Sequence, residues 1–348
     1  MPRAAIVGGG LCGFAAYLTL RRAGVEDVTV FSPESDPAAA FRRRASAIRQ
    51  THMRSESDGH CLPTSFPGLA VREALGRRTP APLVASVCDR YHPTVETFLV
   101  HVDELRASSG WAPVATRIER IAAANGGFEL DGHGVFEHVL VATGHPGLSV
   151  PDELRDDPRA VHAYEPHDYA ETVCVVGAGL AAATEWRNAL AAGARVTSVR
   201  RREPTHRPLN VPRPYLSKRG LARFHRLDAD VRAATLHDLL GPSYPREAHV
   251  EVPVERRVNR ADQVICATGF LQGFRHDRLL ARLVDEHRPA TVNGWIELGP
   301  DATVPTLTDA TRTLALGGVA AQWAYPAADT LMGARYVAHS FARRCRTR

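Results

Sequence analysis

The stretch AAIVGGGLCG, residues 4–13, decides how this chain begins to fold. Its four small apolar residues predict a short buried strand, and Gly8, Gly10 and Gly13 after them predict a tight turn into a helix. In such a turn the first glycine permits the bend, the second lets the backbone approach a pyrophosphate, and the third lets helix and strand pack closely. The helix then leads to a second strand, expected at 28–31.

The same pattern recurs later in the chain without a gap. VCVV at 173–176 predicts another buried strand, and Gly177, Gly179 and Ala182 occupy the places of the three glycines. A helix and a strand expected at 195–199 complete the unit. One such pattern is weak evidence, but two copies in full strand–turn–helix context predict two dinucleotide-binding units. In each unit a phosphate would lie against the free N–H groups at the start of the helix.

The residue nineteen positions after the third glycine or alanine of the turn, at the end of the second strand of each unit, selects the nucleotide. In the first unit it is Ser32, at a position where a carboxylate usually binds the ribose hydroxyls, and Glu34 is a nearby substitute. In the second unit it is Arg201, flanked by Arg200 and Arg202. Because a guanidinium pairs well with phosphate oxygens, these arginines favour a nucleotide with a 2′-phosphate, NADPH, over NADH. The alternative interpretation of the three arginines is a solvated strand end.

The composition excludes several classes of protein. The 348 residues are 44% hydrophobic and 23% charged, which is enough for about two domains with buried cores. No apolar run approaches the ~18 residues of a membrane-spanning helix, and the glycines near the start of the chain argue against a signal peptide, so a cytoplasmic location is expected. The net charge of +5 is spread along the chain without a nucleic-acid-binding motif, so no nucleic-acid partner is expected.

The reactive side chains give no catalytic or metal site. The six cysteines contain no C-x-x-C pair and no grouping with histidine at zinc spacing, which argues against a dithiol redox centre and against a structural metal. Cys12, Cys174 and Cys266 lie in apolar or glycine-rich stretches and are expected to be reduced and buried. We assign no catalytic side chain, because no histidine has a partner evident from sequence. The histidines considered for acid–base roles are His52, His60, His162, His167 and His225.

Taken together, these features resemble the flavoproteins with two dinucleotide-binding domains. VATG at 141–144 and ICATGF at 265–270 are similar to the strands ending in Ala-Thr-Gly that close each domain in that class. Segments 314–318 and 329–332 resemble its last FAD segment, in which a helix N-terminus faces the flavin. Within the class, the lack of a C-x-x-C pair and the presence of Gly318 are most like the class B flavin monooxygenases, which include the flavin-containing monooxygenases and the ornithine- and lysine-type N-hydroxylases.

The resemblance implies an α/β fold with two Rossmann-like domains. An NADPH-binding domain at 149–269 would be inserted into an FAD-binding domain formed by 1–148 and 270–348. Asp329 has a second interpretation as a helix cap. The residues implied to contact FAD are Gly8, Gly10, Gly13, Ser32, Glu34, Thr143, Gly144, Gly318, Asp329 and Leu331. Those implied to contact NADPH are Gly177, Gly179, Ala182, Arg200, Arg201, Thr268 and Gly269.

The resemblance also implies a reaction. NADPH would reduce FAD, and the reduced flavin would react with oxygen to give a C4a-hydroperoxide that oxygenates a small molecule, by N-hydroxylation or a related step. Two alternatives stay open: an NAD(P)H-dependent flavin reductase, dehydrogenase or oxidase that inserts no oxygen, and a nucleotide-binding regulator whose FAD site is degenerate at Ser32. Segments 42–91 and 204–257 lack clear periodicity and are expected to form irregular loops that determine specificity. The sequence predicts neither the substrate nor the oligomeric state.

Overall fold

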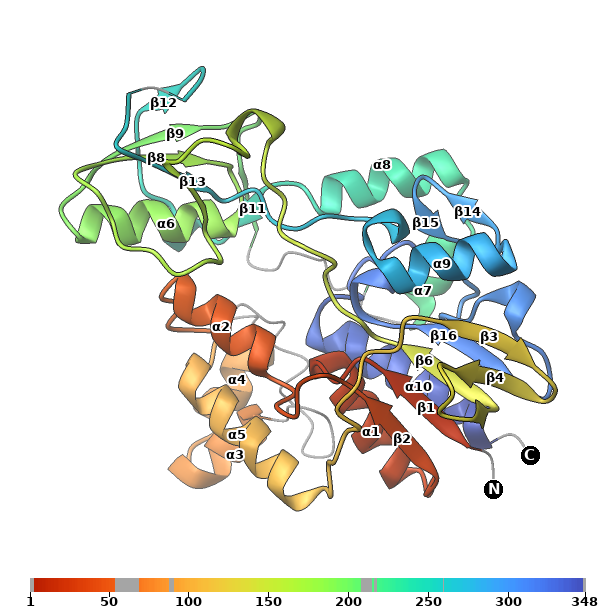
Figure 1. Cartoon of the computed structure of the whole chain (residues 1–348). Coiled ribbons are helices and arrows are strands. Elements are labelled where there is room, and N and C mark those ends of the chain that lie inside the picture. Colours follow the sequence, from red (N-terminus) through yellow and green to blue (C-terminus); the bar gives the residue numbers. More distant parts are fainter. Residues whose placement is uncertain are drawn as a thin grey trace.

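Two parallel β-sheets form the framework of the chain in the computed structural model (Figure 1). The first sheet has the strand order β16-β6-β1-β2. Ile6 in its β1 strand pairs with Val30 on one side and Leu140 on the other, so the first predicted strand lies inside this sheet. Its strands are β1 (Ala4–Val7), β2 (Val28–Phe31), β6 (His138–Val141) and β16 (Thr313–Leu316). The structure describes residues 3–53, 69–87, 91–207, 215, 218–258 and 260–346.

The second sheet has the strand order β12-β9-β8-β13-β7 and is also parallel. Val175 of β8 pairs with Ser198 and Ile265, which places the second predicted strand inside this sheet. All five strands lie between β6 and β16 in the chain, so the second lobe is inserted into the first, and the predicted fold class is confirmed. The strands are β7 (Ala160–His162), β8 (Thr172–Val176), β9 (Arg195–Val199), β12 (Val254–Glu255) and β13 (Gln263–Cys266).

The two chain segments that pass between the lobes are paired with each other. The amide of Ser149 donates to the carbonyl of Gly269 at 3.0 Å, and the amide of Leu271 donates to the carbonyl of Gly147 at 3.0 Å. The hydroxyl of Thr268 also donates to the carbonyl of Ser149. This crossing lies where the domain boundaries 148/149 and 269/270 are expected, although the boundaries themselves stay predictions.

Helices cover both sheets. α1 (Leu11–Arg22) and α10 (Leu331–Arg346) pack along each other on the first sheet, and α6 (Leu180–Ala191) packs on the second. No helix in the described part of the chain is long and apolar enough to cross a membrane. The other elements outside the two longer segments are α5 (Val95–Ser108), β3 (Ile121–Ala124), β4 (Gly127–Leu130), β5 (Val135–Phe136), η2 (Asp152–Leu154), η5 (Phe274–His276), α9 (Arg278–His287), β14 (Thr291–Val292), β15 (Trp295–Ile296), η6 (Pro305–Leu307) and η7 (Gly318–Ala321).

The two segments expected to be irregular contain regular structure, which corrects the sequence interpretation. In the first, Arg42, Arg43 and Arg44 form a polar run within a helix whose buried face is made of small alanines, so no hydrophobic period is visible. In the second, Arg232 of the helix α8 (Ala229–Leu239) is buried beside Leu236 and Leu239, so the buried positions do not follow the hydrophobic residues of the sequence. The elements are α2 (Ala39–Ala47), α3 (Leu69–Arg77), α4 (Ala81–Val87), β10 (Thr205–His206), α7 (Lys218–His225), α8 (Ala229–Leu239), β11 (Ser243–Tyr244) and η4 (Arg246–Ala248).

Each glycine turn depends on a glycine pressed against a neighbouring strand end. Gly8 has φ +109°, and a Cβ there would collide with the carbonyl of Ala142. Gly177 has φ +135°, and a Cβ there would collide with the carbonyl of Ala267. By contrast, a Cβ on Gly179 would meet nothing within 4 Å. The fold therefore requires glycine at the first position of each turn, whereas a Cβ at the second position would meet no neighbouring atom.

We expect Gly177→Ala to lower the free energy of unfolding by about 2 kcal/mol or more, because backbone strain alone costs about 1–3 kcal/mol and the collision adds to it. Gly179→Ala is the matched control and should cost less, about 1 kcal/mol or below, because its Cβ meets nothing within 4 Å and alanine is only a poorer N-cap than glycine. Thermal and urea denaturation of both variants would measure the difference. Equal losses in the two variants would contradict the turn geometry.

Candidate functional site

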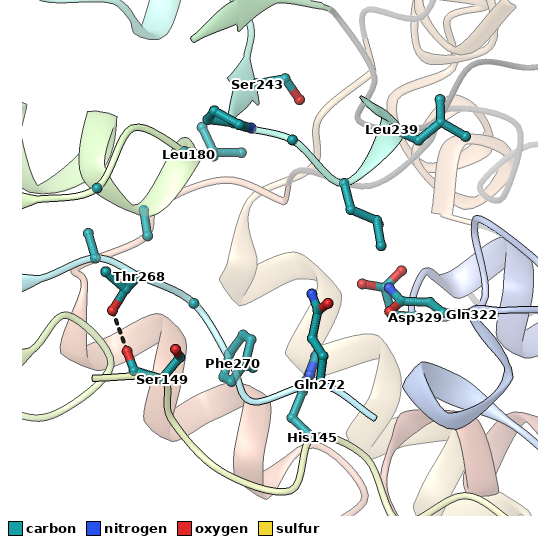
Figure 2. Close-up of a pocket in the computed structure, with 18 of the residues that line it drawn as sticks. His145, Ser149, Leu180, Leu239, Ser243, Thr268, Phe270, Gln272, Gln322 and Asp329 are labelled. Carbon is teal, nitrogen blue, oxygen red and sulfur yellow. Dashed lines mark hydrogen bonds between the residues drawn. The ribbon is translucent and has the colours of Figure 1, made fainter. Parts of the chain in front are cut away.

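A cavity of about 1180 Å³ lies between the two lobes (Figure 2). Leu11 and Cys12 at the start of α1 line it, together with residues 328–331 around the start of α10. The second lobe contributes the turn at 176–181 and the strand end at 199–202. The starts of α1, α6 and α10 therefore border one shared space.

The helices that follow the glycine turns begin without side-chain caps. α1 has Gly10 at its N-cap and α6 has Gly179, and in neither helix does a capping side chain accept a hydrogen bond from the first turn. The first N–H groups of a helix have no partner within the helix, and they carry the positive end of the helix dipole. Both helix starts thus offer backbone donors that suit a phosphate group.

Nine of the predicted contact residues line this cavity, and the other eight do not. The lining residues are Gly177, Gly179, Arg200, Arg201, Thr268, Gly269, Gly318, Asp329 and Leu331. The predicted residues outside the lining are Gly8, Gly10, Gly13, Ser32, Glu34, Thr143, Gly144 and Ala182. Gly8 and Gly13 shape the first turn through close backbone packing, and Ala182 is buried under the second turn.

The hydroxyl of Ser32 is engaged within its own loop. Ser32 is only 5% exposed; its Oγ donates to the carbonyl of Glu34 at 2.8 Å and accepts from the amide of Glu34 at 3.3 Å. The carboxylate of Glu34 pairs with Arg43 at 2.6 Å and is partly exposed. Of the two predicted ribose contacts, Glu34 is the one whose polar group remains accessible.

The threonines of the two Ala-Thr-Gly segments make structural hydrogen bonds. Thr143 Oγ1 donates to Asp277 Oδ2 at 2.6 Å, and the other oxygen of Asp277 accepts from the amides of Leu279 and Leu280 at the start of α9. Thr268 donates to Ser149 across the lobe crossing (Figure 2). Both hydroxyls therefore hold backbone segments in place.

The three arginines after β9 differ in environment. Arg200 forms an ion pair with Glu203 at 2.9 Å, lies over the Trp186 ring, and has a side chain only 12% exposed. Arg201 and Arg202 are exposed at the cavity edge, and neither forms an ion pair within the described part of the chain. Arg201 and Arg202 are therefore better placed than Arg200 to bind an added anion.

The start of α10 corrects one expectation. The hydroxyl of Thr330 accepts from the amide of Gly333 at 3.1 Å, so Thr330, and not Asp329, caps the helix. Asp329 points into the cavity beside Gln322 (Figure 2). Enclosure by protein raises the pKa of the Asp329 carboxyl, although the Gln322 amide opposes this shift. Gln322 Oε1 is buried and has no hydrogen-bond partner in the described part of the chain.

An aromatic stack that the sequence interpretation missed lies at the lobe crossing. Phe270 stacks on His145 with ring centroids 3.9 Å apart and on Tyr164 with centroids 5.0 Å apart, and the Arg44 guanidinium lies 4.5 Å from the Phe270 centroid. Burial, with a smaller effect of Arg44, lowers the pKa of His145 to about 4, so its ring is neutral at neutral pH. His145 and Phe270 each directly follow an Ala-Thr-Gly segment, and this shared position was the sequence signal that could have predicted their contact.

Of the histidines considered from sequence, the four in the described part of the chain do not line the cavity. His162 Nε2 contacts the carbonyl of Gly269 at 3.0 Å, and His167 is buried against Glu185 at 3.1 Å. The part of the chain that the structure describes includes His52 and His225 but not His60, and neither of the two lines the cavity.

A partly buried ion pair joins segment 204–257 to the first lobe. Arg232 of α8 donates to Glu297 at 2.9 Å, and the indole of Trp323 donates to the other oxygen of Glu297 at 2.6 Å. The Arg232 guanidinium also lies 4.7 Å from the Trp323 ring centroid. Figure 1 shows α8 beside β14 and β15, away from the second sheet. One wall of the cavity, formed by α8 residues such as Leu236, is thereby held on the first lobe.

No protein-family model matches the chain, and no curated protein is similar enough in sequence to match it. Solved structures are similar along its whole length. Ornithine hydroxylase from Pseudomonas aeruginosa is 15% identical, with a TM-score of 0.70 and 99% of both chains covered. The cadaverine monooxygenase of desferrioxamine biosynthesis from Erwinia amylovora, solved with FAD, is 12% identical, with a TM-score of 0.73, 100% of this chain and 95% of that chain covered.

Two further structures widen the comparison. A Kutzneria ornithine N-hydroxylase, solved with reduced FAD, NADP+ and L-ornithine, is 13% identical, with a TM-score of 0.72 and 99% of both chains covered. A bacillithiol disulfide reductase from Staphylococcus aureus is 17% identical, with a TM-score of 0.58, 98% of this chain and 97% of that chain covered. These likenesses support the α/β fold with two parallel sheets that the strand orders show.

We expect Thr330→Ala to lower the free energy of unfolding by about 1 kcal/mol, because the amide of Gly333 loses its acceptor. Asp329→Ala should leave stability unchanged or slightly raised, because burial disfavours the charged carboxylate and Asp329 does not cap the helix. Thermal denaturation at pH 7 would compare the two variants. A loss confined to Asp329→Ala would show that the helix is capped by the aspartate.

Proposed function

We propose that this protein is an FAD- and NADPH-dependent monooxygenase that oxygenates a small molecule. The observation that carries the proposal is the single cavity bordered by the starts of α1, α6 and α10. A flavin held on the first lobe and a nicotinamide held on the second would meet there. The likeness to ornithine and cadaverine hydroxylases supports this function over the others that the fold allows.

The residues of the first lobe fit FAD through their backbone. The turn at 8–13 leaves space above Gly10, and the uncapped start of α1 offers N–H groups to the pyrophosphate. Glu34 is the accessible carboxylate for the ribose, in competition with its ion pair to Arg43. The start of α10, with Asp329 and Leu331, would face the flavin ring. When bound, FAD supplies the redox chemistry, by accepting a hydride and reducing oxygen.

The residues of the second lobe fit NADPH. The turn from Gly177 to Gly179 and the uncapped start of α6 would hold the pyrophosphate. Arg201, with Arg202 next to it, would pair with the 2′-phosphate, while Arg200 stays bound to Glu203. The domains inferred from this assignment are an FAD-binding domain of 1–148 and 270–348 and an NADPH-binding domain of 149–269.

The chain's own side chains would position the ligands and exclude water. Phe270 and the neutral His145 form a flat wall where the lobes cross, and Leu236 and Trp323 line the side closed by α8. An apolar wall strengthens electrostatic interactions inside the cavity and protects reactive species from water. We assign no proton transfer to a named side chain.

We expect Arg201→Ala to raise KM for NADPH about tenfold or more and to leave KM for NADH nearly unchanged, because only NADPH carries the 2′-phosphate. The matched control is Arg195→Ala, at the other end of β9, where the arginine pairs with Glu171. Steady-state kinetics with both nucleotides would test the assignment. Equal effects of Arg201→Ala on NADPH and NADH would refute the phosphate contact.

The decisive experiment compares NADPH consumed with oxygenated product formed by purified, FAD-loaded protein over a panel of amines and ketones. A monooxygenase gives product in proportion to NADPH for at least one substrate. Hydrogen peroxide or reduced acceptor without oxygenated product, across the whole panel, would replace the proposal with a flavin reductase or oxidase. Protein that is colourless and cannot be reconstituted with FAD would instead be a nucleotide-binding regulator.

A further inference from the structure

The large cavity has one apolar wall that neither glycine turn provides. The wall combines leucine and alanine side chains of α8 with two indole rings of the first lobe, and all but Leu239 pack together in one apolar cluster. His237 and Asn293 are polar residues that also line the cavity. The residues of this surface, called the α8 wall below, are Ala233, Leu236, Leu239, Leu240, Trp295 and Trp323.

The α8 wall lies outside both predicted nucleotide-binding units. α8 belongs to segment 204–257, which follows β9, the last strand of the second unit. The ion pair of Arg232 with Glu297 holds α8 on the first lobe. The two pyrophosphates are expected at the starts of α1 and α6, which contribute other residues to the lining. The α8 wall is therefore the surface left for a third ligand, the substrate.

A polar pair adjoins the α8 wall. Gln322 directly precedes Trp323 in the chain and donates a hydrogen bond from its side-chain amide to the Asp329 carboxyl group, and both polar residues line the cavity (Figure 2). Gln322 is only 3% exposed, and its Oε1 has no hydrogen-bond partner within the described residues. The pair thus brings carboxyl and amide oxygens, both hydrogen-bond acceptors, to the edge of an apolar surface.

The charged group beside the α8 wall is acidic. Among the described residues, the arginines that line the cavity are Arg200, Arg201 and Arg202, and all three follow β9 in the second lobe. Enclosure by protein raises the pKa of Asp329. A cation bound next to this carboxyl group would lower its pKa again and keep it ionised. This part of the cavity therefore favours a cationic group that is attached to an apolar body.

We propose that the substrate is a primary amine with an apolar body and no second charged group. Asp329 and Gln322 hold its ammonium group, and its carbon chain lies along the α8 wall. The assignment rests on the proposed function, in which Asp329 faces the flavin ring, so the nitrogen lies beside that ring. An amino acid would bring its carboxylate, and a diamine its second ammonium group, against leucine and tryptophan side chains, where loss of hydration is costly for a charge.

Calorimetric titration of the full-length protein saturated with FAD and NADP+ tests the substrate class without turnover. Hexylamine and cadaverine are matched probes, because they have equally many non-hydrogen atoms and an ammonium group of cadaverine replaces the methyl group of hexylamine. We expect hexylamine to bind about tenfold or more tightly than cadaverine and ornithine, and each methylene from butylamine to octylamine to tighten binding about threefold. Equal or tighter binding of cadaverine or ornithine overturns the proposal, and so does absence of hexylamine binding.

Two variants test the two parts of the site separately. Asp329→Asn should weaken hexylamine binding about tenfold or more and leave binding of hexanol, which has no ammonium group, nearly unchanged. Leu240→Asn should narrow the difference between hexylamine and cadaverine. Its control is Leu190→Asn, at an exposed leucine of α6 that does not line the cavity. Equal losses of hexylamine and hexanol in Asp329→Asn, or equal effects of the two leucine variants, contradict the proposed contacts.

Failure of the substrate class and failure of the monooxygenase proposal give different results. Preferred binding of cadaverine or ornithine would overturn the apolar amine and leave oxygenation standing. Hexylamine that binds as expected but yields no oxygenated product would overturn the monooxygenase and leave the ligand class standing. The comparison of probes uses the unaltered protein, so it decides the substrate class even where a variant fails to fold.

Discussion

The structure depends on two close contacts between a glycine and a strand-end carbonyl. Gly8 lies against Ala142, and Gly177 lies against Ala267. Each alanine begins the Ala-Thr-Gly segment of its lobe, so this contact joins the two sequence signatures of that lobe at one point. It fixes where β1 and β8 end, and hence where α1 and α6 begin and which way their free N–H groups point. A side chain at either glycine would push the helix start away from the cavity.

Local sequence predicted the features that depend on local contacts. The strands at 4–7 and 173–176, their turns and the helices after them follow from short apolar runs and glycine spacing, and the structure has them. Features that depend on distant partners were not predictable. Arg232 appears as an exposed cation in sequence, because the carboxylate that allows its burial, Glu297, lies 65 residues away. Thr330 and Asp329 are adjacent and both suit a cap, and only the fold distinguishes them.

The predicted nucleotide contacts also differ according to whether they depend on the backbone or on a side chain. Four predicted contacts whose role lies in the backbone, Gly177, Gly179, Gly269 and Gly318, line the cavity, whereas Gly8, Gly10, Gly13 and Gly144 do not. Predicted contacts that depend on a side chain are less regular: Ser32 and Thr143 are engaged elsewhere, and Arg200 is paired with Glu203 while Arg201 stays exposed. Spacing fixes where the backbone lies, whereas the state of each side chain depends on neighbours that the motif does not include.

The ion pair of Arg232 and Glu297 has a consequence for ligand binding. The chain passes between the lobes at 147–149 and 269–271, and α8 provides a third attachment by returning to the first lobe. Three attachments restrict lobe rotation more than a two-strand hinge does. The relative positions of the two lobes around the cavity are then set by folding, before any ligand binds. Because the cleft does not have to close when a ligand binds, more of the binding energy is available for recognising the ligand.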